Sequence, residues 1–493
     1  MGAQALPADR GASERVVVVG GGLTGLAAAH RLASRPQASR RPAEVLLLEA
    51  KPRLGGSIWT QRRDGFTLEG GADSFITNKP WGVDLCRELG LGDRLIGPDP
   101  RNRRSFVVRR GALQPVPEGF VLMAPSRLGP VLASPILSIR GKLRLLMDLV
   151  LPRRSAEGDE SLASFAQRRL GREVLERLVQ PLVGGIYTAD PAELSLSATL
   201  PQFPAMERDH RSLILGARRE ARARGDKAAT GASGARYGLF ASLDEGMDVL
   251  PRALAAALPA GVARVDAPIR RITRPDPGGP WRVEPLDGPP ILAAAVILAT
   301  EAHASARLVD GFDPELAQHL RTIPYASSIV ANIAYRREDI RHPLNGFGVV
   351  VPAIEGRSVL AVSFTSVKFP ARAPAGTVLL RVFVGGATQP DLFDLDAAAI
   401  EALVRRELAE LLGARGEPIL IDVGRHPRAM PQYSLGHQDR VATIRAREAR
   451  HAGLGLAGNA FGGVGIPDCI RAGREAADAA LAALVEAGRN AAA

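Results

Sequence analysis

The sequence predicts a protein of class α/β plus α+β, with a parallel-sheet domain, an antiparallel-sheet domain and an inserted helical segment. Three stretches lead to this prediction. Residues 15–49 have the pattern of a strand, a glycine turn, a helix and a second strand, residues 98–205 are mostly helical in pattern, and residues 301–415 alternate short strands with one helix. At 493 residues the chain is long enough for two or three such substructures.

The first stretch has the pattern of a dinucleotide-binding unit. A β-branched run from Val16 to Val19 is typical of a parallel strand that is buried on both faces, and it ends in a GxGxxG motif. In such a motif the first glycine permits a tight turn, the second lets the backbone approach a pyrophosphate, and the third lets the helix pack on the strand. The helix that follows offers free N–H groups to the phosphates. The residues that we place at the phosphates are Gly20, Gly22, Leu23, Thr24 and Gly25.

An acidic residue at the end of the next strand supports this interpretation. Glu49 lies where a carboxylate can accept hydrogen bonds from the ribose hydroxyls. A second GxGxxG match begins at Gly453, but no helix pattern follows it directly. We therefore expect one nucleotide site, in a Rossmann-like domain near the amino terminus, with a purely structural turn as the alternative.

Two glycine-rich stretches downstream indicate further contacts with the same cofactor. The first, RLGGS at residues 53–57, has the RxGG form that lies beside the flavin pyrophosphate and ribityl chain in flavoproteins with two dinucleotide-binding domains; a simple turn is the alternative. The second, residues 66–75, reads as a strand and a glycine bend that would pass close to an isoalloxazine ring. The candidates here are Arg53, Gly55, Gly56, Ser57, Gly71, Ala72, Asp73 and Ser74.

The carboxy-terminal stretch also has features of a cofactor site. It reads as a strand, a glycine loop and a final helix that begins near Pro467. The free N–H groups and the positive dipole end of that helix would stabilise negative charge, such as that on a reduced flavin. The three glycines before it, Gly462, Gly463 and Gly465, favour close approach of the backbone to a flat ligand. The remaining cofactor candidates are Ile269, Ala299, Asn459, Val464 and Ile466.

Composition limits the partners and the compartment. The net charge of +11 fits acidic substrates, anionic membrane surfaces or nucleic acid, although biased codon usage would produce the same excess of arginine. Aromatic residues make up only 4% and are not interleaved with basic stretches, which argues against nucleic acid. Cys86 and Cys469 are too few for a disulfide framework or a structural metal site, and no secretory signal is apparent, so we expect a cytoplasmic protein without a metal.

No apolar run is long enough to predict a membrane-spanning helix, because the longest candidate, Leu128 to Leu151, is interrupted by charged residues. Within residues 98–205, apolar residues bordered by Arg and Lys suit an amphipathic surface that rests in a membrane interface; an ordinary helical subdomain is the alternative. Residues 207–227 read as one basic, solvated helix, and residues 291–300 as one buried strand. The predicted order is nucleotide domain in residues 1–97, 206–300 and 436–493, helical membrane-associating domain in 98–205, and substrate-binding domain in 301–435.

With these motifs the chain resembles the oxygen-dependent protoporphyrinogen oxidase family, within the amine-oxidase-like flavoproteins, over nearly its whole length. The stretches most specific to that resemblance are residues 184–201 (GGIYTADPAELSLSATLP), 206–217 (MERDHRSLILGA), 346–352 (GFGVVVP) and 431–437 (PQYSLGH). Two departures stand out. Ala189 replaces a glycine of the usual GIYAGDP, which adds a methyl group near the expected substrate pocket, and Glu245 replaces a glycine before Met247.

The resemblance implies noncovalently bound FAD and the oxidation of protoporphyrinogen IX to protoporphyrin IX in three rounds, each passing hydride to flavin N5 and reducing O2 to H2O2. This is the penultimate step of haem or chlorophyll synthesis. The implied fold has a nucleotide domain of the p-hydroxybenzoate hydroxylase type, a substrate domain, and a helical domain on one membrane leaflet, here the inner face of the cell membrane. A homodimer is compatible with the resemblance, and no acid or base residue is implied.

The resemblance also suggests residues that position the substrate. Arg104 would pair with a propionate, because a guanidinium suits a carboxylate; a surface charge among neighbouring arginines is the alternative. Phe364 would stack on the macrocycle, with a simple core role as the alternative. Gly185 would line the pocket from a loop, and Val349 would line it from the facing strand.

Three other functions stay open at this point. A coproporphyrinogen III oxidase of the same flavin family is one, since the arginines at residues 101–110 could serve four propionates instead of two. A flavin amine oxidase or carotenoid desaturase is another, disfavoured by the resemblance outside the cofactor motifs. The third is a non-catalytic FAD-binding or membrane-scaffold protein.

Overall fold

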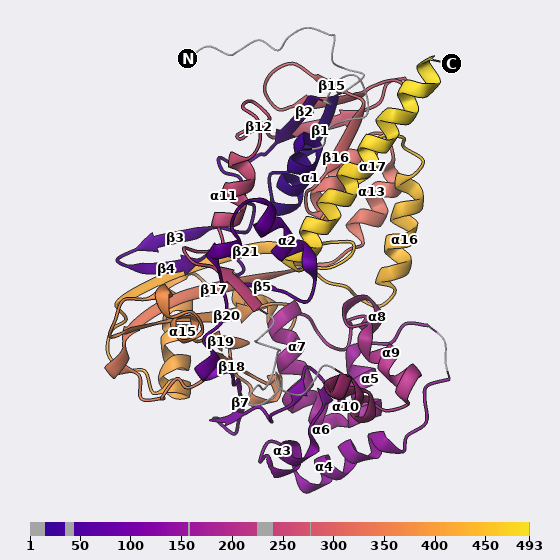
Figure 1. The fold of residues 1–493 in the computed structure, drawn as a ribbon. Helices are drawn as coiled ribbons and strands as arrows, with labels where there is room; N and C mark the ends of the chain where they lie inside the picture. The colour runs from indigo at the N-terminus through magenta and orange to yellow at the C-terminus, as the bar shows by residue number, and fades with distance from the viewer. Residues whose placement is uncertain (1–14, 35–43, 156–157, 224–239, 277, 493) are drawn as a thin grey trace.

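A computed structural model describes residues 15–34, 44–155, 158–223, 240–276 and 278–492. A parallel sheet with its helices lies at one end of the molecule, a seven-stranded sheet lies in the middle, and a region of short helices lies at the other end (Figure 1). Strand β1, where the described chain begins, and the carboxy-terminal part of α17 both lie at the end that carries the parallel sheet (Figure 1).

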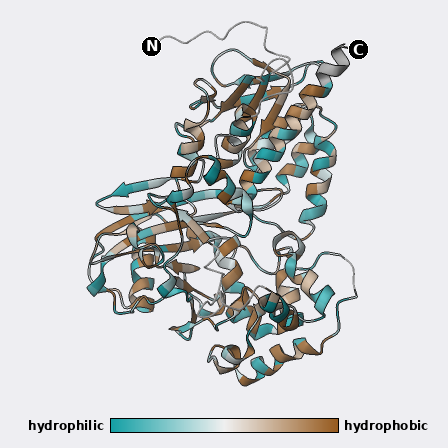
Figure 2. Cartoon of the chain, viewed as in Figure 1, coloured by the Kyte–Doolittle hydropathy of each residue, from teal (hydrophilic) through white to brown (hydrophobic). Residues whose placement is uncertain are grey.

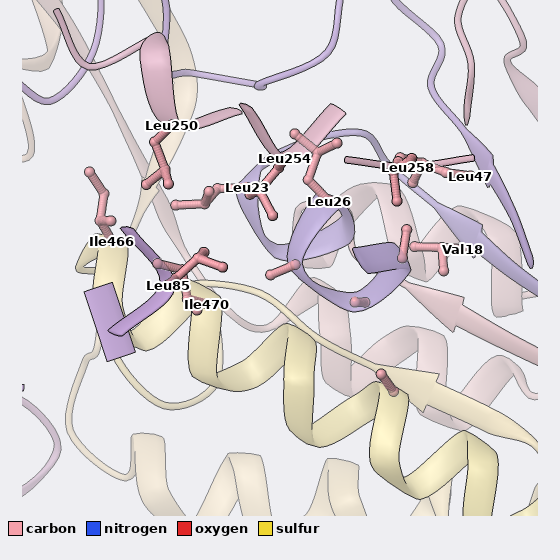
Figure 3. Close-up of a cluster of buried hydrophobic side chains, with 14 of the residues drawn as sticks. Val18, Leu23, Leu26, Leu47, Leu85, Leu250, Leu254, Leu258, Ile466 and Ile470 are labelled. Atoms are coloured by element: carbon pink, nitrogen blue, oxygen red, sulfur yellow. The ribbon is translucent and has the colours of Figure 1, made fainter. Parts of the chain in front are cut away.

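The parallel sheet is built as the first motif predicts. Its strands, in spatial order, are β12 (Ala263–Arg264), β2 (Glu44–Leu48), β1 (Arg15–Val19), β16 (Ala295–Leu298) and β22 (Leu454–Leu456), and every pairing is parallel. Because side chains alternate along a strand, Val16 and Val18 face one core and Val17 and Val19 face another. The first core lies under helices α1 (Leu23–Ser34) and α17 (Ile466–Ala492) and includes Val18, Leu26 and Leu47 (Figure 3).

The second core lies under a small antiparallel sheet and two helices. The sheet consists of β13 (Ile269–Thr273), β14 (Trp281–Pro285) and β15 (Ile291–Ala293), and the helices are α12 (Ala302–Val309) and α13 (Pro314–Arg321). The single strand expected over residues 291–300 is therefore two strands in different sheets. Helices α12 and α13 pack in this core, although the expected substrate domain began at residue 301.

The seven-stranded sheet is antiparallel except for the pair β18–β7. Its strands, in spatial order, are β21 (Leu420–Pro431), β17 (Tyr325–Arg336), β20 (Thr377–Gly385), β19 (Ala361–Ser363), β18 (Gly348–Val350), β7 (Phe106–Arg109) and β8 (Ala112–Pro115). One face packs on helix α15 (Ala397–Leu412). Strands β7 and β8, which we expected within the helical segment, thus complete this sheet.

The helical region is formed by α3 (Leu128–Ala133), α4 (Ile139–Leu146), α5 (Leu162–Leu170), α6 (Arg172–Val174), a π-helical turn (Leu175–Val179), α7 (Gln180–Tyr187), α8 (Leu196–Thr199), α9 (Gln202–His210) and α10 (Leu213–Ala223). Of the helix expected over residues 207–227, the described part up to Ala223 belongs to α9 and α10, because the chain turns at Arg211 with φ of +64°. Residues 224–227 lie outside the described residues. A fully buried ion pair holds that turn: Arg169 donates to the Arg211 carbonyl oxygen at 2.7 Å, and Asp148 accepts from Ser212 at 2.6 Å. Both helices pack in the core of this region, so the expected boundary at residue 205 falls inside it.

Smaller elements join these parts. They are the hairpin β3 (Thr60–Arg63) and β4 (Phe66–Glu69), the sheet β5 (Phe75–Ile76), β11 (Phe240–Leu243) and β6 (Leu95–Ile96), the pair β9 (Phe120–Val121) and β10 (Ala124–Pro125), and helices α2 (Pro80–Glu88), α11 (Val249–Ala256), α14 (Thr365–Lys368) and α16 (His437–Glu448). Apolar residues fill the strands of the parallel sheet and recur on the helices of the helical region (Figure 2). In the described part of the chain, no helix combines the length and the apolar character needed to cross a membrane.

Candidate active site

The glycine turn after β1 is tightly packed at two positions and open at the third. A Cβ built on Gly20 would lie 2.7 Å from the Ala299 carbonyl oxygen, and one built on Gly25 would lie 1.9 Å from the Gly20 carbonyl oxygen. A Cβ on Gly22 would meet only the Gly56 Cα, at 3.9 Å. Packing within the protein therefore explains why Gly20 and Gly25 are glycines, whereas the space beside Gly22 is free for a ligand to approach. Leu23 and Thr24 are buried at the start of α1.

The second glycine stretch packs directly on this turn. The Gly55 N–H donates to the Gly21 carbonyl oxygen at 2.8 Å, and a Cβ on Gly56 would lie 3.0 Å from the Gly22 Cα. The exposed Arg53 side chain folds back and donates to the Gly56 carbonyl oxygen at 2.7 Å. The third stretch follows at once, because a Cβ on Gly71 would lie 2.0 Å from the Ser57 carbonyl oxygen. The three glycine stretches, at residues 20–25, 53–57 and 70–71, are thus in contact with one another although other residues separate them in the sequence.

Glu49 lies at the carboxyl end of β2, with 9% of its surface exposed. One carboxylate oxygen accepts the Gly21 N–H at 2.6 Å, and the other accepts the Lys51 N–H at 2.9 Å. A carboxylate has about four acceptor positions, so two remain for ligand hydroxyls. Ile269 begins β13 two residues after Ala267, whose N–H donates to the Glu49 carbonyl oxygen at 2.9 Å.

The amino-terminal end of α17 reaches the same region. Gly473 in α17 lies against α1, where a Cβ would be 2.2 Å from the Thr24 carbonyl oxygen. The preceding loop contains Asn459 and Val464, both partly buried, and Ile466 begins the helix. Asp468 in the first turn accepts from Lys79 Nζ at 2.7 Å through both of its oxygens. Part of the positive end of this helix is therefore already matched by a carboxylate of the protein itself.

Asp73 and Ser74 make contacts within the protein that the sequence did not predict. The Asp73 carboxylate accepts from Lys368 Nζ at 3.1 Å and from the Ser74 hydroxyl at 2.7 Å, and Ser74 also accepts from Lys368 at 2.9 Å. Arg381 lies 3.7 Å from the same carboxylate and donates to the Gly71 carbonyl oxygen. The Asp73 and Ser74 side chains are thus engaged with the protein while staying partly exposed, and Ala72 is the exposed residue of the loop from Gly71 to Ser74.

A second buried ion pair, Glu69 with Arg372, lies beside the pair formed by Asp73 and Lys368. Glu69, 1% exposed, lies 3.5 Å from Arg372, which has no exposed surface, and accepts from the Thr60 hydroxyl at 2.7 Å. Burial raises the pKa of Glu69 above its usual value, although Thr60 and Arg372 favour its charged form. Burial would also raise the pKa of Asp73, but Lys368 and Arg381 outweigh it and hold that pKa well below its usual range.

The face of the seven-stranded sheet opposite α15 looks toward this loop and toward α7. Arg381 pairs with Ser363 and with Asn332 across neighbouring strands, so these three side chains share that face. Val350 shares it too, and its Cγ1 would lie 3.8 Å from a Cβ on Gly185. Gly185 lies in a narrow crevice lined by Gln180, Pro181, Gly184, Gly185, Thr188, Ala189, Val351, Leu360 and Thr388.

Two substrate candidates point the other way. Val349, 1% exposed, and Phe364, with no exposed surface, both belong to the core between the sheet and α15. Phe364 packs 5.8 Å from the His342 ring, measured between ring centroids. Our expectation that they contact substrate is therefore corrected: a side chain with no exposed surface cannot stack on a ligand without rearrangement, and the core role fits Phe364.

Arg104 is exposed and lies just before β7, where its carbonyl oxygen accepts the Phe347 N–H at 2.9 Å. It therefore lies at the start of β18, whereas the crevice beside Gly185 lies past the end of that strand, at Val351. The structure does not bring these two candidates together.

Sequence reasoning missed the charged residues that hold the 71–74 loop. A signal was present for one of them: Arg381 is the one charged residue in the apolar strand β20, whereas Lys368 follows the uncharged but mixed stretch SFTSV. Charged residues in apolar stretches are rarely buried unless they are paired. Within the described residues, no group of His, Cys, Asp and Glu is arranged to hold a metal ion.

Comparison with known proteins decides the family. The family described as flavin containing amine oxidoreductase matches residues 23–481. The chain belongs to this family. A coproporphyrinogen III oxidase of Bacillus subtilis is 34% identical, over 95% of this chain and 98% of the relative, and one of Propionibacterium freudenreichii is 37% identical, over 97% and 93%. Protoporphyrinogen oxidase 1 of Arabidopsis thaliana is 31% identical, over 94% and 87%.

Solved structures agree. The crystal structure of a proposed protoporphyrinogen oxidase from Exiguobacterium sp. 255-15 aligns with a TM-score of 0.82 at 30% identity, over 95% of this chain and 99% of that one. A putrescine oxidase aligns with a TM-score of 0.66 at 18% identity, which shows a shared fold. The chain is thus a flavin oxidoreductase of the porphyrinogen oxidase family, and FAD is its cofactor.

The residues present fit this flavoprotein cofactor. The space beside Gly22 is open, as close approach of a pyrophosphate requires, and Glu49 has acceptor positions left for ribose hydroxyls. Gly56 packs on Gly22 and Gly71 packs on Ser57, so the later glycine stretches adjoin this turn.

Proposed function

We propose that this flavoprotein oxidises protoporphyrinogen IX to protoporphyrin IX, with O2 as the electron acceptor and H2O2 as the second product. The crevice beside Gly185 is the observation that carries the choice of substrate. Its lining contains no charged side chain, although Gln180, Thr188 and Thr388 are polar, and this favours the porphyrinogen with two propionates over the one with four. The family and the relatives named above support the reaction type.

Coproporphyrinogen III is the second candidate. The two bacterial relatives that carry the name coproporphyrinogen III oxidase are 34% and 37% identical to this chain. Exposed arginines precede and follow β7, among them Arg104 and Arg110, and they offer partners for additional carboxylates.

For the cofactor, we propose that Gly22 admits the pyrophosphate, Glu49 accepts from the ribose, and the backbone of residues 71–74 lies beside the ring system together with the loop before α17. The domain that holds it would be of the p-hydroxybenzoate hydroxylase type. When bound, FAD accepts hydride at N5 and passes the electrons to O2. The chain itself supplies orientation: α7 and the Val350 face of the sheet hold the macrocycle, and Arg104 binds a propionate.

We also propose that the protein attaches peripherally to the inner face of the cell membrane. Along α4 and the turn after it, Ile139, Leu143, Met147 and Val150 recur about one turn apart and are 77%, 61%, 46% and 70% exposed. The exposed Arg140 lies beside them, and α4 lies at the end of the molecule away from the parallel sheet (Figure 1). An exposed apolar row with a cationic border suits an anionic lipid surface.

Anaerobic mixing tests the proposed reaction. Purified holoenzyme is mixed with protoporphyrinogen IX or with coproporphyrinogen III while the flavin absorbance is followed. We expect rapid bleaching by protoporphyrinogen and slower bleaching by coproporphyrinogen. The reverse order would assign the second substrate, and no bleaching by either would refute porphyrinogen oxidation.

A further inference from the structure

Residues 432–437, within the PQYSLGH stretch, are fastened to the helical region by their backbone. The Ser195 N–H donates to the Tyr433 carbonyl oxygen at 2.7 Å, and the Leu435 N–H donates to the Glu193 carbonyl oxygen at 2.9 Å. The Gly436 N–H donates to the Asp159 carboxylate at 3.1 Å. This segment, which we term the 432–437 segment, is therefore fixed to the loop between α7 and α8 and to the stretch just before α5.

The Tyr433 side chain points to a different part of the fold. Its hydroxyl donates to the Asn459 carbonyl oxygen at 2.6 Å and accepts the Gly463 N–H at 2.7 Å. These two residues bracket the turn of the loop between β22 and α17. The Tyr433 hydroxyl thus joins the two ends of that turn. It bonds the Asn459 carbonyl oxygen and the Gly463 N–H, which do not bond each other.

Tyr433 and the neighbouring His437 are both neutral near pH 7, which suits a tyrosine hydroxyl that makes two hydrogen bonds. Burial raises the pKa of Tyr433 far above its usual value, so the phenol keeps its proton and can donate and accept at once. His437 stacks on the Tyr433 ring with centroids 4.0 Å apart, and burial lowers its pKa to about 4. Near neutral pH a neutral imidazole therefore packs flat against the tyrosine and holds its rotamer.

The turn that Tyr433 closes sets the start of α17. Gly463 has φ of +131°, and a Cβ there would lie 2.3 Å from Asp468 Cγ in the first helical turn. Val464, the next residue, packs against the core of the helical region, to which Tyr433 also belongs. The position of Val464 and Ile466 thus depends on contacts with the helical region as well as on the nucleotide domain.

We infer that Tyr433 is a positioning residue for the cofactor, which fixes the 459–465 loop and ties its place to the helical region. The inference rests on the proposed location of the flavin beside this loop. The PQYSLGH stretch then has a role of its own, which is to couple the helical region to the cofactor site. Through Tyr433, a displacement of the loop between α7 and α8 moves the backbone that faces the flavin ring.

Tyr433→Phe tests the inference, because it removes both hydrogen bonds and keeps the stacked ring. We expect FAD to bind about 5- to 50-fold more weakly, as follows from leaving a buried N–H and C=O unpaired. We also expect the visible flavin spectrum and the flavin midpoint potential to shift. Tyr335→Phe is the matched control: Tyr335 is likewise 2% exposed but lies in the core on the α15 side of the sheet, so FAD affinity, spectrum and potential should stay at the wild-type values.

Flavin properties that are unchanged in Tyr433→Phe, or changed equally in both tyrosine variants, would overturn the inference. Hydrogen exchange of the wild-type holoenzyme gives a measurement that needs no variant. The Gly463 amide should be protected, and rapid exchange would rule out the bond to Tyr433. Gly22→Val separates this from the proposed site: if Gly22→Val abolishes FAD binding and Tyr433→Phe leaves the flavin unchanged, only the inference about Tyr433 fails.

Discussion

Removal of the Lys368 charge should destabilise the protein at neutral pH through Asp73. In Lys368→Met, a side chain of similar length keeps the packing but leaves the Asp73 carboxylate without its nearest cation. Both side chains are largely buried, at 9% and 14% exposed. Breaking a buried pair by removing one partner costs about 3–5 kcal/mol. Asp73 keeps Ser74 at 2.7 Å and Arg381 at 3.7 Å, so we expect a cost somewhat below that range, about 2–3 kcal/mol.

The cost should depend on pH in a defined direction. The folded-state pKa of Asp73 is held below its usual value, so its ionised form contributes stability that is fully present above about pH 4 and is lost as the pH falls further. A protonated Asp73 no longer needs Lys368. The difference in unfolding free energy between wild type and Lys368→Met should therefore shrink below about pH 4.

Urea denaturation followed by circular dichroism at pH 7 and at pH 3.5 measures both effects. Arg405→Met is the control, because the side chains of its ion pair with Glu417 are 33% and 80% exposed, so its loss should cost far less than the loss of Lys368. In an Asp73→Asn background, Lys368→Met should cost clearly less than it does alone. An equal cost in both backgrounds, or a cost that does not change with pH, would refute the assignment of this stability to the Asp73 pair.

Four further outcomes are expected. Gly22→Val should abolish FAD binding in a folded protein, as measured by flavin fluorescence, because the side chain fills the space left for the pyrophosphate; stoichiometric FAD in that variant would contradict the placement. Glu49→Ala should weaken FAD binding by about 1–3 kcal/mol, and unchanged affinity would place the ribose elsewhere. Ile139→Asp with Leu143→Asp should abolish flotation with anionic vesicles and leave activity in detergent unchanged; flotation equal to wild type would exclude α4 as the contact. Arg104→Ala should raise KM, whereas esterified propionates should cost the wild type more than the variant; equal losses would show that Arg104 does not bind a carboxylate.

The nucleotide half of the molecule could be predicted closely because its signals are local. The β-branched run before Gly20, the glycine spacing and Glu49 are set by backbone geometry within one βαβ unit, and the parallel sheet forms around them. Contacts between stretches far apart in sequence were also predictable in outline. Gly56 and Gly71 were expected near one cofactor, and the structure packs each of them on the preceding stretch.

The substrate side was less predictable because a strand pattern does not say which face meets the ligand. The run from Gly348 to Val351 is apolar throughout, so Val349 and Val350 look alike in sequence, and a shift of one residue reverses the face. Only pairing with β19, and the packing of α15 on one side, decides that Val350 faces α7. Likewise, the hairpin of β7 and β8 joins a sheet whose other strands come more than 200 residues later, and nothing local indicates that partner.

The same reasoning explains why the groups that fix the cofactor loops lie outside the motifs. A glycine loop that lets a flat ligand approach its backbone has few side chains of its own with which to hold its conformation. Its rigidity has to come from neighbours, and in this fold these are polar side chains one layer further out: Arg381 and Lys368 for residues 71–74, and Tyr433 for residues 459–463. Each is buried, so each hydrogen bond is costly to lose. Substitution of these residues should therefore change the geometry and potential of the flavin while every glycine of the motifs is intact.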